Sequence, residues 1–273
     1  MMVSIEELAA RIVDGTHLAI PVDFNAFFSG AAMEVTRHLV RAGRRKLRLL
    51  VMPSNGMQAD ILIGAGCVSE LEAGAMLMPE LGTPPRFSDA MRSGRLQVRD
   101  STCPAIFHGL GAAEKGIPFI PMAGVIGADV VARRADWKVI ADPFDPDHDI
   151  LLVPAIRPDI ALFHAPLADR HGNVWLGRRR EVALLAHAAR QTLVTAERIF
   201  DGDLMNTPLY EDGTLSGVYV HAVAHCPGGS WPLDAGSDAP GDTTQLRRYF
   251  EAARTEEGFA RYLEDVFMPG APR

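Results

Sequence analysis

The chain has 273 residues, of which 48% are hydrophobic and 22% charged, and its formal net charge is −7 at pH 7. These values are ordinary for a globular protein that can bury a substantial core. The acidic balance argues against nucleic acid or an anionic membrane surface as the main partner.

Helices and strands alternate through the first half of the chain. Ser4 with Glu7 at the capping-box spacing predicts a helix over residues 4–13, which ends before Gly15. The same patterns predict further helices over residues 31–42, 59–63, 88–93 and 104–115. Strands are expected between them at residues 16–20, 47–52, 68–71 and 96–98.

The second half continues the alternation. Strands are predicted at residues 137–140, 151–153, 160–164, 192–196 and 218–224, and helices at residues 183–189, 243–254 and 256–267. Strands separated by helices predict an α/β fold, a mainly parallel, layered α/β/α sheet. We find no repeats and no low-complexity linker, so we expect one domain over residues 1–273, with residues 227–242 forming a long loop inside it.

The predicted location is the cytoplasm. No apolar run approaches the ~18–20 residues that span a bilayer, and the amphipathic start does not resemble a signal peptide. The three cysteines, Cys67, Cys103 and Cys226, are widely spaced and odd in number, which fits a reducing compartment without a disulfide framework.

A polar turn, Pro53-Ser54-Asn55-Gly56, follows the strand over residues 47–52. Open α/β sheets bind ligands at the carboxyl ends of their strands, so this turn is a candidate site. It contains no carboxylate, and Ser54 has no base beside it in sequence. We therefore expect a ligand-binding turn that lacks a catalytic group of its own.

Two other segments are predicted to meet this turn at one cleft. The loop over residues 22–29 interleaves three phenylalanines with polar residues; at least one should enter the core, while Phe24 or Phe27 should line a pocket. The segment over residues 117–129 mixes prolines and glycines with apolar residues, which excludes a plain helix or strand, and its part over residues 121–127 is the one expected at the cleft. The pocket candidates are Asp23, Phe24, Asn25, Phe27, Ser54, Asn55, Gly56, Pro121, Gly124 and Gly127.

Other motifs favour structural interpretations. Gly64-Ala-Gly66 lacks the third glycine of a dinucleotide fingerprint and follows a helix, so we interpret it as a tight turn. The alternating segment around His221 and His225 predicts a strand, on which these rings would lie ~13 Å apart, too far for one metal ion. No metal site is expected. No Gly-x-Ser-x-Gly nucleophile elbow is present either.

Two polar stretches in the second half are also interpreted as structural. His164 is expected at a strand end, and residues 169–173 have the composition of a turn that holds the fold together. The run Arg178-Arg179-Arg180-Glu181 is expected to form a solvated face, with phosphate or partner binding as the alternative.

The chain resembles the α subunits of family I CoA-transferases, close to the α subunit of glutaconate CoA-transferase. The resemblance is carried in order by MPSNG with QADILIGAGCVSELEAG, by GLGAAEKGIPFIPMAGVIGAD, by WKVIADPF, by LLVPAIRPDIALFHAPLADRHGNV and by LRRYFEAARTEEGFARYLEDV. No single motif is diagnostic, but the ordered set is specific and covers nearly the whole chain.

The resemblance implies a division of labour between two chains. In the family, the β subunit has the same fold and carries a Ser-Glu-Asn-Gly turn whose glutamate is the nucleophile, and the turn with Ser54 is its counterpart here. No catalytic residue is then expected on this chain. Acyl-CoA and carboxylate are the implied substrates, and coenzyme A takes part as a substrate, with no metal and no permanently bound cofactor.

Two departures bear on the pocket. The Gly-Gly turn that often follows the first strand in the family is replaced here by Ile20-Pro21-Val22, and Trp231 stands where the family often has histidine. The substrate therefore does not carry over from the resemblance.

Two alternatives stay open. Related ring-opening CoA-thioester hydrolases tend to have carboxylates in the stretch that matches residues 100–104, where this chain has only Asp100. The other alternative is a non-catalytic domain that senses a small ligand. A neighbouring gene whose product has the Ser-Glu-Asn-Gly turn favours the transferase, a partner without that glutamate favours the hydrolase, and no partner favours the sensor.

Overall fold

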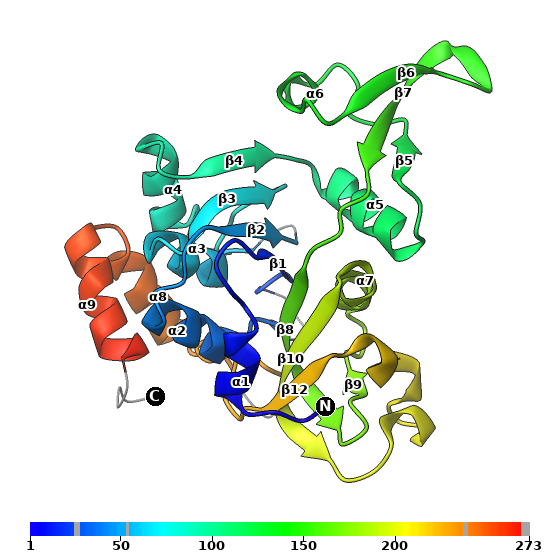
Figure 1. The fold of residues 1–273 in the computed structure, drawn as a ribbon. Helices are drawn as coiled ribbons and strands as arrows, with labels where there is room; N and C mark the ends of the chain where they lie inside the picture. Colours follow the sequence, from blue (N-terminus) through cyan, green and yellow to red (C-terminus); the bar gives the residue numbers. More distant parts are fainter. Residues whose placement is uncertain (25–27, 53–54, 237–239, 269–273) are drawn as a thin grey trace.

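The structure, a computed structural model, describes residues 1–24, 28–52, 55–236 and 240–268. Nine strands within these residues form the main sheet, in the order β11-β9-β8-β1-β2-β3-β4, and β10 pairs with both β8 and β12 (Figure 1). The strands are β1 (His17–Ile20), β2 (Leu47–Val51), β3 (Val68–Ala73), β4 (Gln97–Asp100), β8 (Ile160–Asp169), β9 (Val174–Trp175), β10 (Gln191–Phe200), β11 (Thr214–Leu215) and β12 (Ala222–His225).

The main sheet is mostly parallel, as predicted. β1 pairs in parallel with β2 and β8, β2 with β3, and β3 with β4; β10 pairs in parallel with β8 and β12. Only the short strands β9 and β11 pair antiparallel, at one end of the sheet. The prediction of a mainly parallel α/β fold is confirmed.

Helices cover both faces of this sheet, which explains why its strands are apolar on both sides. Leu18 and Ile20 of β1 pack against the first helices of the chain, whereas Ala19 packs against Ile106 and Leu185 on the opposite face. The helices are α1 (Ile5–Ala10), α2 (Met33–Arg41), α3 (Met57–Gly64), α4 (Pro85–Arg92), α5 (Cys103–Glu114), α6 (Asp129–Arg133), α7 (Arg180–Ala188), α8 (Thr243–Ala252) and α9 (Glu256–Phe267).

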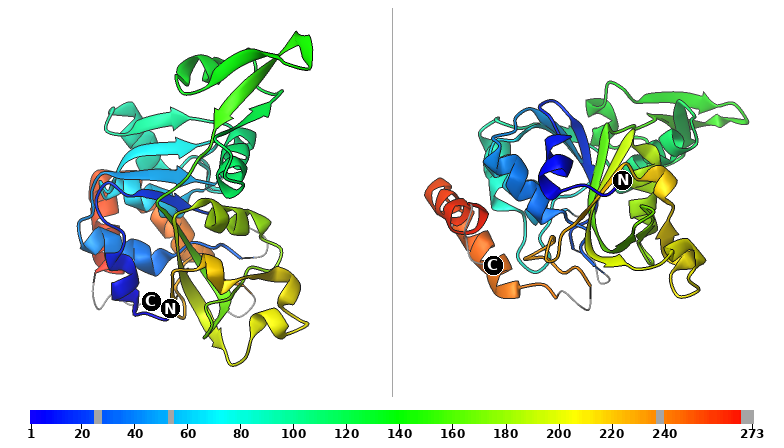
Figure 2. Two further views of the ribbon diagram at one scale, coloured as in Figure 1. Left: turned by 45° about the vertical axis from the view of Figure 1, so that its right-hand side comes forward. Right: turned by 60° about the horizontal axis from the view of Figure 1, so that its bottom comes forward.

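The two closing helices, α8 and α9, lie outside α2 and α3 (Figure 2). Tyr249 of α8 is fully buried, and its hydroxyl donates a 2.6 Å hydrogen bond to Asp60 of α3. Phe259 of α9 packs in the same cluster. A Cβ at Gly64 would approach the Phe259 ring to 2.7 Å, so the absence of a side chain there allows α9 to dock closely.

A second, three-stranded sheet projects from the main body (Figures 1 and 2). It consists of β5 (Phe119–Met122), β7 (Asp145–Pro154) and β6 (Lys138–Asp142), in the order β5-β7-β6, and both pairs are antiparallel. The expectation of a parallel arrangement is wrong here, because only two residues separate β6 from β7 and a tight turn can join only antiparallel strands. The single-domain organisation stays a prediction.

Other local expectations are corrected. A 3₁₀ turn over Gly217–Tyr219 interrupts the strand predicted over residues 218–224, so His221 lies outside β12. The Nδ1 atom of His221 accepts a 3.1 Å hydrogen bond from the backbone N–H of Thr192. The turn after β8 has the structural role expected of it. The Asp169 carboxylate accepts hydrogen bonds from the backbone N–H groups of His171 and Asn173, each at 2.9 Å.

No helix in the part of the chain described here is long and apolar enough to cross a membrane. The described residues also contain no group of three or more histidine, cysteine or acidic side chains placed to hold a metal ion.

Candidate functional site

The loop after β1 is tied to the turn after β2 by Asp23. Its side chain is 1% exposed, and it accepts hydrogen bonds from the backbone N–H groups of Gly56 at 2.9 Å and Gln58 at 3.1 Å. These donors lie at the start of α3, whose N-cap residue, Gly56, has no side chain with which to cap the helix. Burial raises the pKa of the Asp23 carboxyl to about 7, although the N–H groups of Gln58 and Gly56 favour the charged form.

Asn55 makes the reciprocal link. Its Nδ2 donates to the carbonyl of Pro21 at 2.7 Å, and its Oδ1 accepts from the N–H of Ala59 at 3.2 Å. Gly56 is required by crowding, because a Cβ there would lie 2.7 Å from the Leu77 carbonyl oxygen. Asp23, Asn55 and Gly56 form what we call the Asp23 junction, and their buried polar groups are used in holding the turn. Direct ligand contact by these three residues stays a prediction.

The phenylalanines of the loop divide between core and junction. Phe28 is fully buried, which confirms that at least one of the three enters the core. Phe24 is half-buried and packs against the cluster formed by α8 and α9, and its ring lies beside Gly56. Its predicted place on a pocket rim stays a prediction. The other candidates of these segments, Asn25, Phe27 and Ser54, lie outside the described residues.

Arg179, which immediately precedes α7, holds the same loop. Its Nη1 donates to the carbonyls of Phe28 at 2.7 Å and Ser29 at 2.6 Å, its Nη2 to that of Val22 at 3.0 Å, and its Nε to Glu181 at 2.7 Å. The guanidinium also lies 4.9 Å from the centre of the Phe28 ring. The expected solvated face is therefore wrong for Arg179, which is 2% exposed.

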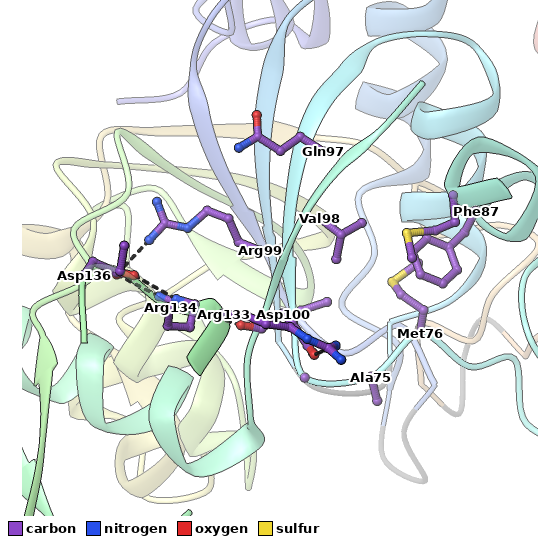
Figure 3. Close-up of a pocket in the computed structure, with 14 residues that line it drawn as sticks. Ala75, Met76, Phe87, Gln97, Val98, Arg99, Asp100, Arg133, Arg134 and Asp136 are labelled. Carbon is purple, nitrogen blue, oxygen red and sulfur yellow. Dashed lines mark hydrogen bonds and ion pairs between the residues drawn. The ribbon is translucent and has the colours of Figure 1, made fainter. Parts of the chain in front are cut away.

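A cleft of about 670 Å³ opens beside the Asp23 junction along the edge strand β4 (Figure 3). Asn55 connects the two, because it forms a β-bridge with Met76 and accepts the N–H of Leu77 at 3.2 Å. One end of the cleft is apolar and the other is charged. The lining residues are Ala73, Gly74, Ala75, Met76, Phe87, Met91, Gln97, Val98, Arg99, Asp100, Arg133, Arg134, Ala135 and Asp136.

The three arginines of the cleft are held very differently. Arg134 is buried, pairs with Glu72 at 2.8 Å and Asp136 at 2.9 Å, and stacks on Trp137. Arg99 pairs with Asp136 at 2.8 Å. The side chain of Arg133 is 66% exposed and lies 3.6 Å from the half-exposed Asp100, a contact that a ligand anion could replace at small cost.

The projecting sheet separates the remaining candidates from the junction. Pro121 lies in β5 and lines another groove, so the predicted meeting of three segments in one cleft is not seen for Pro121. Gly127 adopts a φ of 84° just before α6, which carries Arg133 into the cleft of Figure 3. A substrate contact by Gly124 or Gly127 stays a prediction.

Sequence reasoning missed a polar cluster on β8 and β10. His164 is fully buried; its Nδ1 lies 2.9 Å from the Thr195 hydroxyl and its Nε2 3.1 Å from Glu197. Burial raises the pKa of Glu197, but the hydrogen bonds from His164 and the Gly228 N–H lower it more, and the net direction is downward. Parallel pairing of Thr195 with His164 brings these groups together, which no local motif indicates.

The departure at Trp231 has a structural account. Its ring lies 5.4 Å from the guanidinium carbon of Arg37, and its carbonyl accepts a 3.1 Å hydrogen bond from that arginine. It packs against the cluster of α8 and α9. Trp231 therefore takes part in docking the closing helices.

Comparison with known proteins agrees with this geometry. The family model for coenzyme A transferase matches residues 2–225. One of the subunits of 3-oxoadipate CoA-transferase from Pseudomonas knackmussii is 30% identical over 97% of this chain and 92% of its own length. Glutaconate coenzyme A-transferase from Acidaminococcus fermentans superposes with a TM-score of 0.86 at 25% identity, covering 99% of this chain and 90% of the matched chain.

A further solved structure, of the decarboxylase AibA/AibB, matches with a TM-score of 0.84 at 31% identity over 97% of both chains. Fold, order of motifs and full-length similarity agree, and the chain belongs to the coenzyme A transferase family.

Proposed function

We propose that this chain is the α subunit of a two-subunit CoA-transferase, which moves CoA between an acyl-CoA and a carboxylic acid. A separate β subunit supplies the nucleophilic glutamate. The observation that carries this division is the closed Asp23 junction. Asp23 is the carboxylate that reaches the turn, yet it is buried and engaged by two backbone N–H groups, whereas a nucleophile must approach the thioester carbonyl to about 3–3.5 Å.

The proposed reaction is a double displacement through the glutamate of the β subunit. The carboxylate attacks the thioester carbonyl, forms a mixed anhydride and expels CoA thiolate. The thiolate attacks the glutamyl carbonyl, which releases the first carboxylic acid and leaves a glutamyl-CoA thioester. The acceptor carboxylate then reverses both steps. CoA is a substrate throughout, and these steps require no resident cofactor.

The contribution of this chain is one wall of the acyl site. Met76, Phe87 and Val98 offer the apolar end of the cleft, and Arg133 offers a weakly held cation at the other end. An acyl group with a second carboxylate fits this combination. The names of the two transferase relatives, 3-oxoadipate and glutaconate, refer to dicarboxylic acids as well. We place the enzyme in the cytoplasm, where its three free cysteines stay reduced.

The test is co-expression with the product of the neighbouring gene that has a strand-end Ser-Glu-Asn-Gly turn. The purified pair and each chain alone are mixed with acyl-CoA donors and with mono- or dicarboxylate acceptors, and CoA esters are separated by chromatography. We expect transfer only with both chains and faster transfer to dicarboxylates. Robust transfer by the isolated chain would overturn the two-subunit proposal.

A second candidate is decarboxylation, favoured by the similarity to AibA/AibB over the full length of both chains. The same mixtures separate the activities. Transfer needs an acceptor and conserves the thioester, hydrolysis releases free CoA without an acceptor, and decarboxylation releases CO₂ with the thioester intact. Loss of thioester without an acceptor would favour the hydrolase, for which Asp100 offers a half-exposed carboxylate in the cleft.

A further inference from the structure

The projecting sheet has two largely apolar faces, and the described residues of this chain cover only one of them. Leu151 and Val153 of β7 point inward, where they are buried with Ala105 of α5 and Trp137. The neighbouring residues on the opposite face follow from the register: Leu152 lies between Pro121 of β5 and Lys138 of β6. An antiparallel sheet with one covered face normally has polar residues on the other.

The outer face is instead mostly apolar, with Lys138 and Asp142 as its charged residues on β6. Phe119 is 46% exposed, Ile140 is 40% exposed, and Ile150, which pairs with Ile140, is half-buried. Together with Phe144 at the tip of the β6–β7 hairpin, they line a groove of about 440 Å³. Single exposed apolar residues are ordinary, but a contiguous group on a sheet face indicates an interaction surface.

Phe144 is the most exposed of these residues, at 97%. The turn that presents it is well defined, because its N–H donates a 2.9 Å hydrogen bond to the Asp142 side chain. The hairpin reaches beyond the helices of the main body in Figures 1 and 2. A large aromatic side chain held in this way can insert into a pocket of a partner with little loss of backbone entropy.

Charge decides between a second copy and a different chain. Four aspartates lie at the hairpin, Asp142, Asp145, Asp147 and Asp149. A two-fold contact between identical chains would bring these carboxylates close to each other, in a protein whose net charge is already −7. A different chain with a basic rim around an apolar pocket has no such conflict.

The position of the sheet points to the same partner. Val130 and Val131 of α6 pack under the sheet, whereas Arg133 of the same helix lines the cleft of Figure 3. The sheet and α6 lie between the outer face and the cleft, so a chain seated on that face is held at a defined position relative to the cleft, where the proposed function needs a glutamate from its partner chain.

We propose that the outer face of the β5-β7-β6 sheet, with Phe144 at its tip, is a docking surface for the β subunit. That partner supplies an apolar pocket for Phe144, with lysine or arginine at its rim facing the hairpin aspartates. This inference rests on the proposed function for the identity of the partner. The sheet face provides only part of a stable interface, which buries about 800 Å² on each partner.

The test uses full-length chains and the β subunit from the neighbouring gene. Phe144→Asp and Ile140→Asp are compared with Leu209→Asp, which changes another exposed apolar residue, 77% exposed, far along the chain. Affinity for the immobilised β subunit is measured by biolayer interferometry, and mass by light scattering. We expect each sheet variant to weaken binding at least tenfold and the Leu209 variant to leave it unchanged, with equal melting temperatures of the isolated chains.

The outcomes separate this inference from the proposed function. Unchanged affinity of both sheet variants, with a wild-type pair that transfers CoA, overturns the docking surface alone. A wild-type chain that is dimeric by itself and becomes monomeric through Phe144→Asp assigns the surface to a second copy and also overturns it. Binding that depends on Phe144 in a pair without transferase activity keeps the surface and rejects the activity. Failure of the wild-type chains to bind rejects both.

Discussion

The Asp23 junction and the outer face of the projecting sheet differ in whether their side chains find partners within this chain. At the junction, buried carboxylate and amide groups meet backbone donors and acceptors of the same chain. On the projecting sheet, apolar side chains such as Phe144 face solvent without a covering element in the described part of the chain. The first region is complete as a single chain, and the second has the character of half an interface. Substitutions in the two regions should therefore affect different properties.

The largest effect is expected at Arg179. Replacement by methionine leaves the carbonyls of Val22, Phe28 and Ser29 without their donors and Glu181 without its partner. The free energy of unfolding in urea should fall by about 3–5 kcal/mol, as for other broken buried ion pairs. Arg178→Met is the matched control, because Arg178 is exposed, and should change it by less than about 0.5 kcal/mol. Equal stability of the two variants would contradict the role assigned to Arg179.

Gly56→Ala tests the crowding of the junction. The new Cβ would lie 2.7 Å from the Leu77 carbonyl oxygen and 2.8 Å from the Met78 Cγ, and the former belongs to the backbone. Urea denaturation should show a loss of about 1–3 kcal/mol. Gly111→Ala in α5 is the control, because nothing lies within 4 Å of its added Cβ, and a gain of about 0.5–1 kcal/mol is expected there. A neutral Gly56→Ala variant would show that the turn can move.

The buried carboxyls predict a pH dependence of stability. Burial raises the pKa of Asp23 to about 7 and that of Asp60 to about 6, both from a value of 3.8. Between the unfolded-state pKa and the folded-state pKa, each carboxyl holds its proton more often in the folded chain than in the unfolded chain. These two groups therefore make the free energy of unfolding fall as the pH rises from about 4 to about 7.

The slope is at most about 1.4 kcal/mol per pH unit for each group. In urea denaturation at successive pH values, the Asp23→Asn variant should show a shallower pH dependence of the free energy of unfolding. The contribution of Asp23 is lost in this variant, and that of Asp60 remains. An unchanged slope in the variant would mean that Asp23 titrates normally in the folded protein.

The smallest effect on stability is expected at Arg133. Its pair with Asp100 is largely solvated, so Arg133→Gln should change the free energy of unfolding by less than about 1 kcal/mol. If the cleft binds a dicarboxylic acyl group, the KM for dicarboxylates in the assembled enzyme should rise several-fold, with little change for monocarboxylates. Arg180→Gln, an exposed arginine outside this cleft, serves as the control. An equal rise in KM for both acid classes would argue against a specific carboxylate contact.

Much of the architecture was predictable because it depends on local patterns. The capping box at Ser4 is present, and the apolar runs around Leu18 and Leu49 form adjacent parallel strands. The β6–β7 hairpin was harder to predict, because the strand expected over residues 151–153 begins at Asp145 and includes Asp147 and Asp149. Its strand character comes from pairing with β6, and such pairing overrides the weak β-propensity of aspartate.

The site was predictable as a location but not as a set of contacts. The turn at Asn55 was identified from its place at a strand end, and the structure joins it to the loop that contains Asp23. The structural role of Arg179 was not predicted because its partners lie about 150 residues earlier in the sequence. A run of arginines by itself indicates a solvent-exposed surface. The pairing of His164 with Glu197 likewise depends on strand register, which single-sequence patterns leave open.

The passage from β7 into β8 is pinned at both of its ends. Ala155 donates to the carbonyl of Pro118 at 2.9 Å and Ile156 to that of Gly109 at 2.8 Å, while the carboxylate and N–H of Asp159 bond the backbone of His17 at 2.9 Å. The projecting sheet is therefore anchored by backbone hydrogen bonds at its base, next to the first strand of the main sheet. A partner chain that binds the tip of this sheet is positioned by the same scaffold that positions the cleft. Assembly itself can therefore align the partner with the cleft, with no later closing motion.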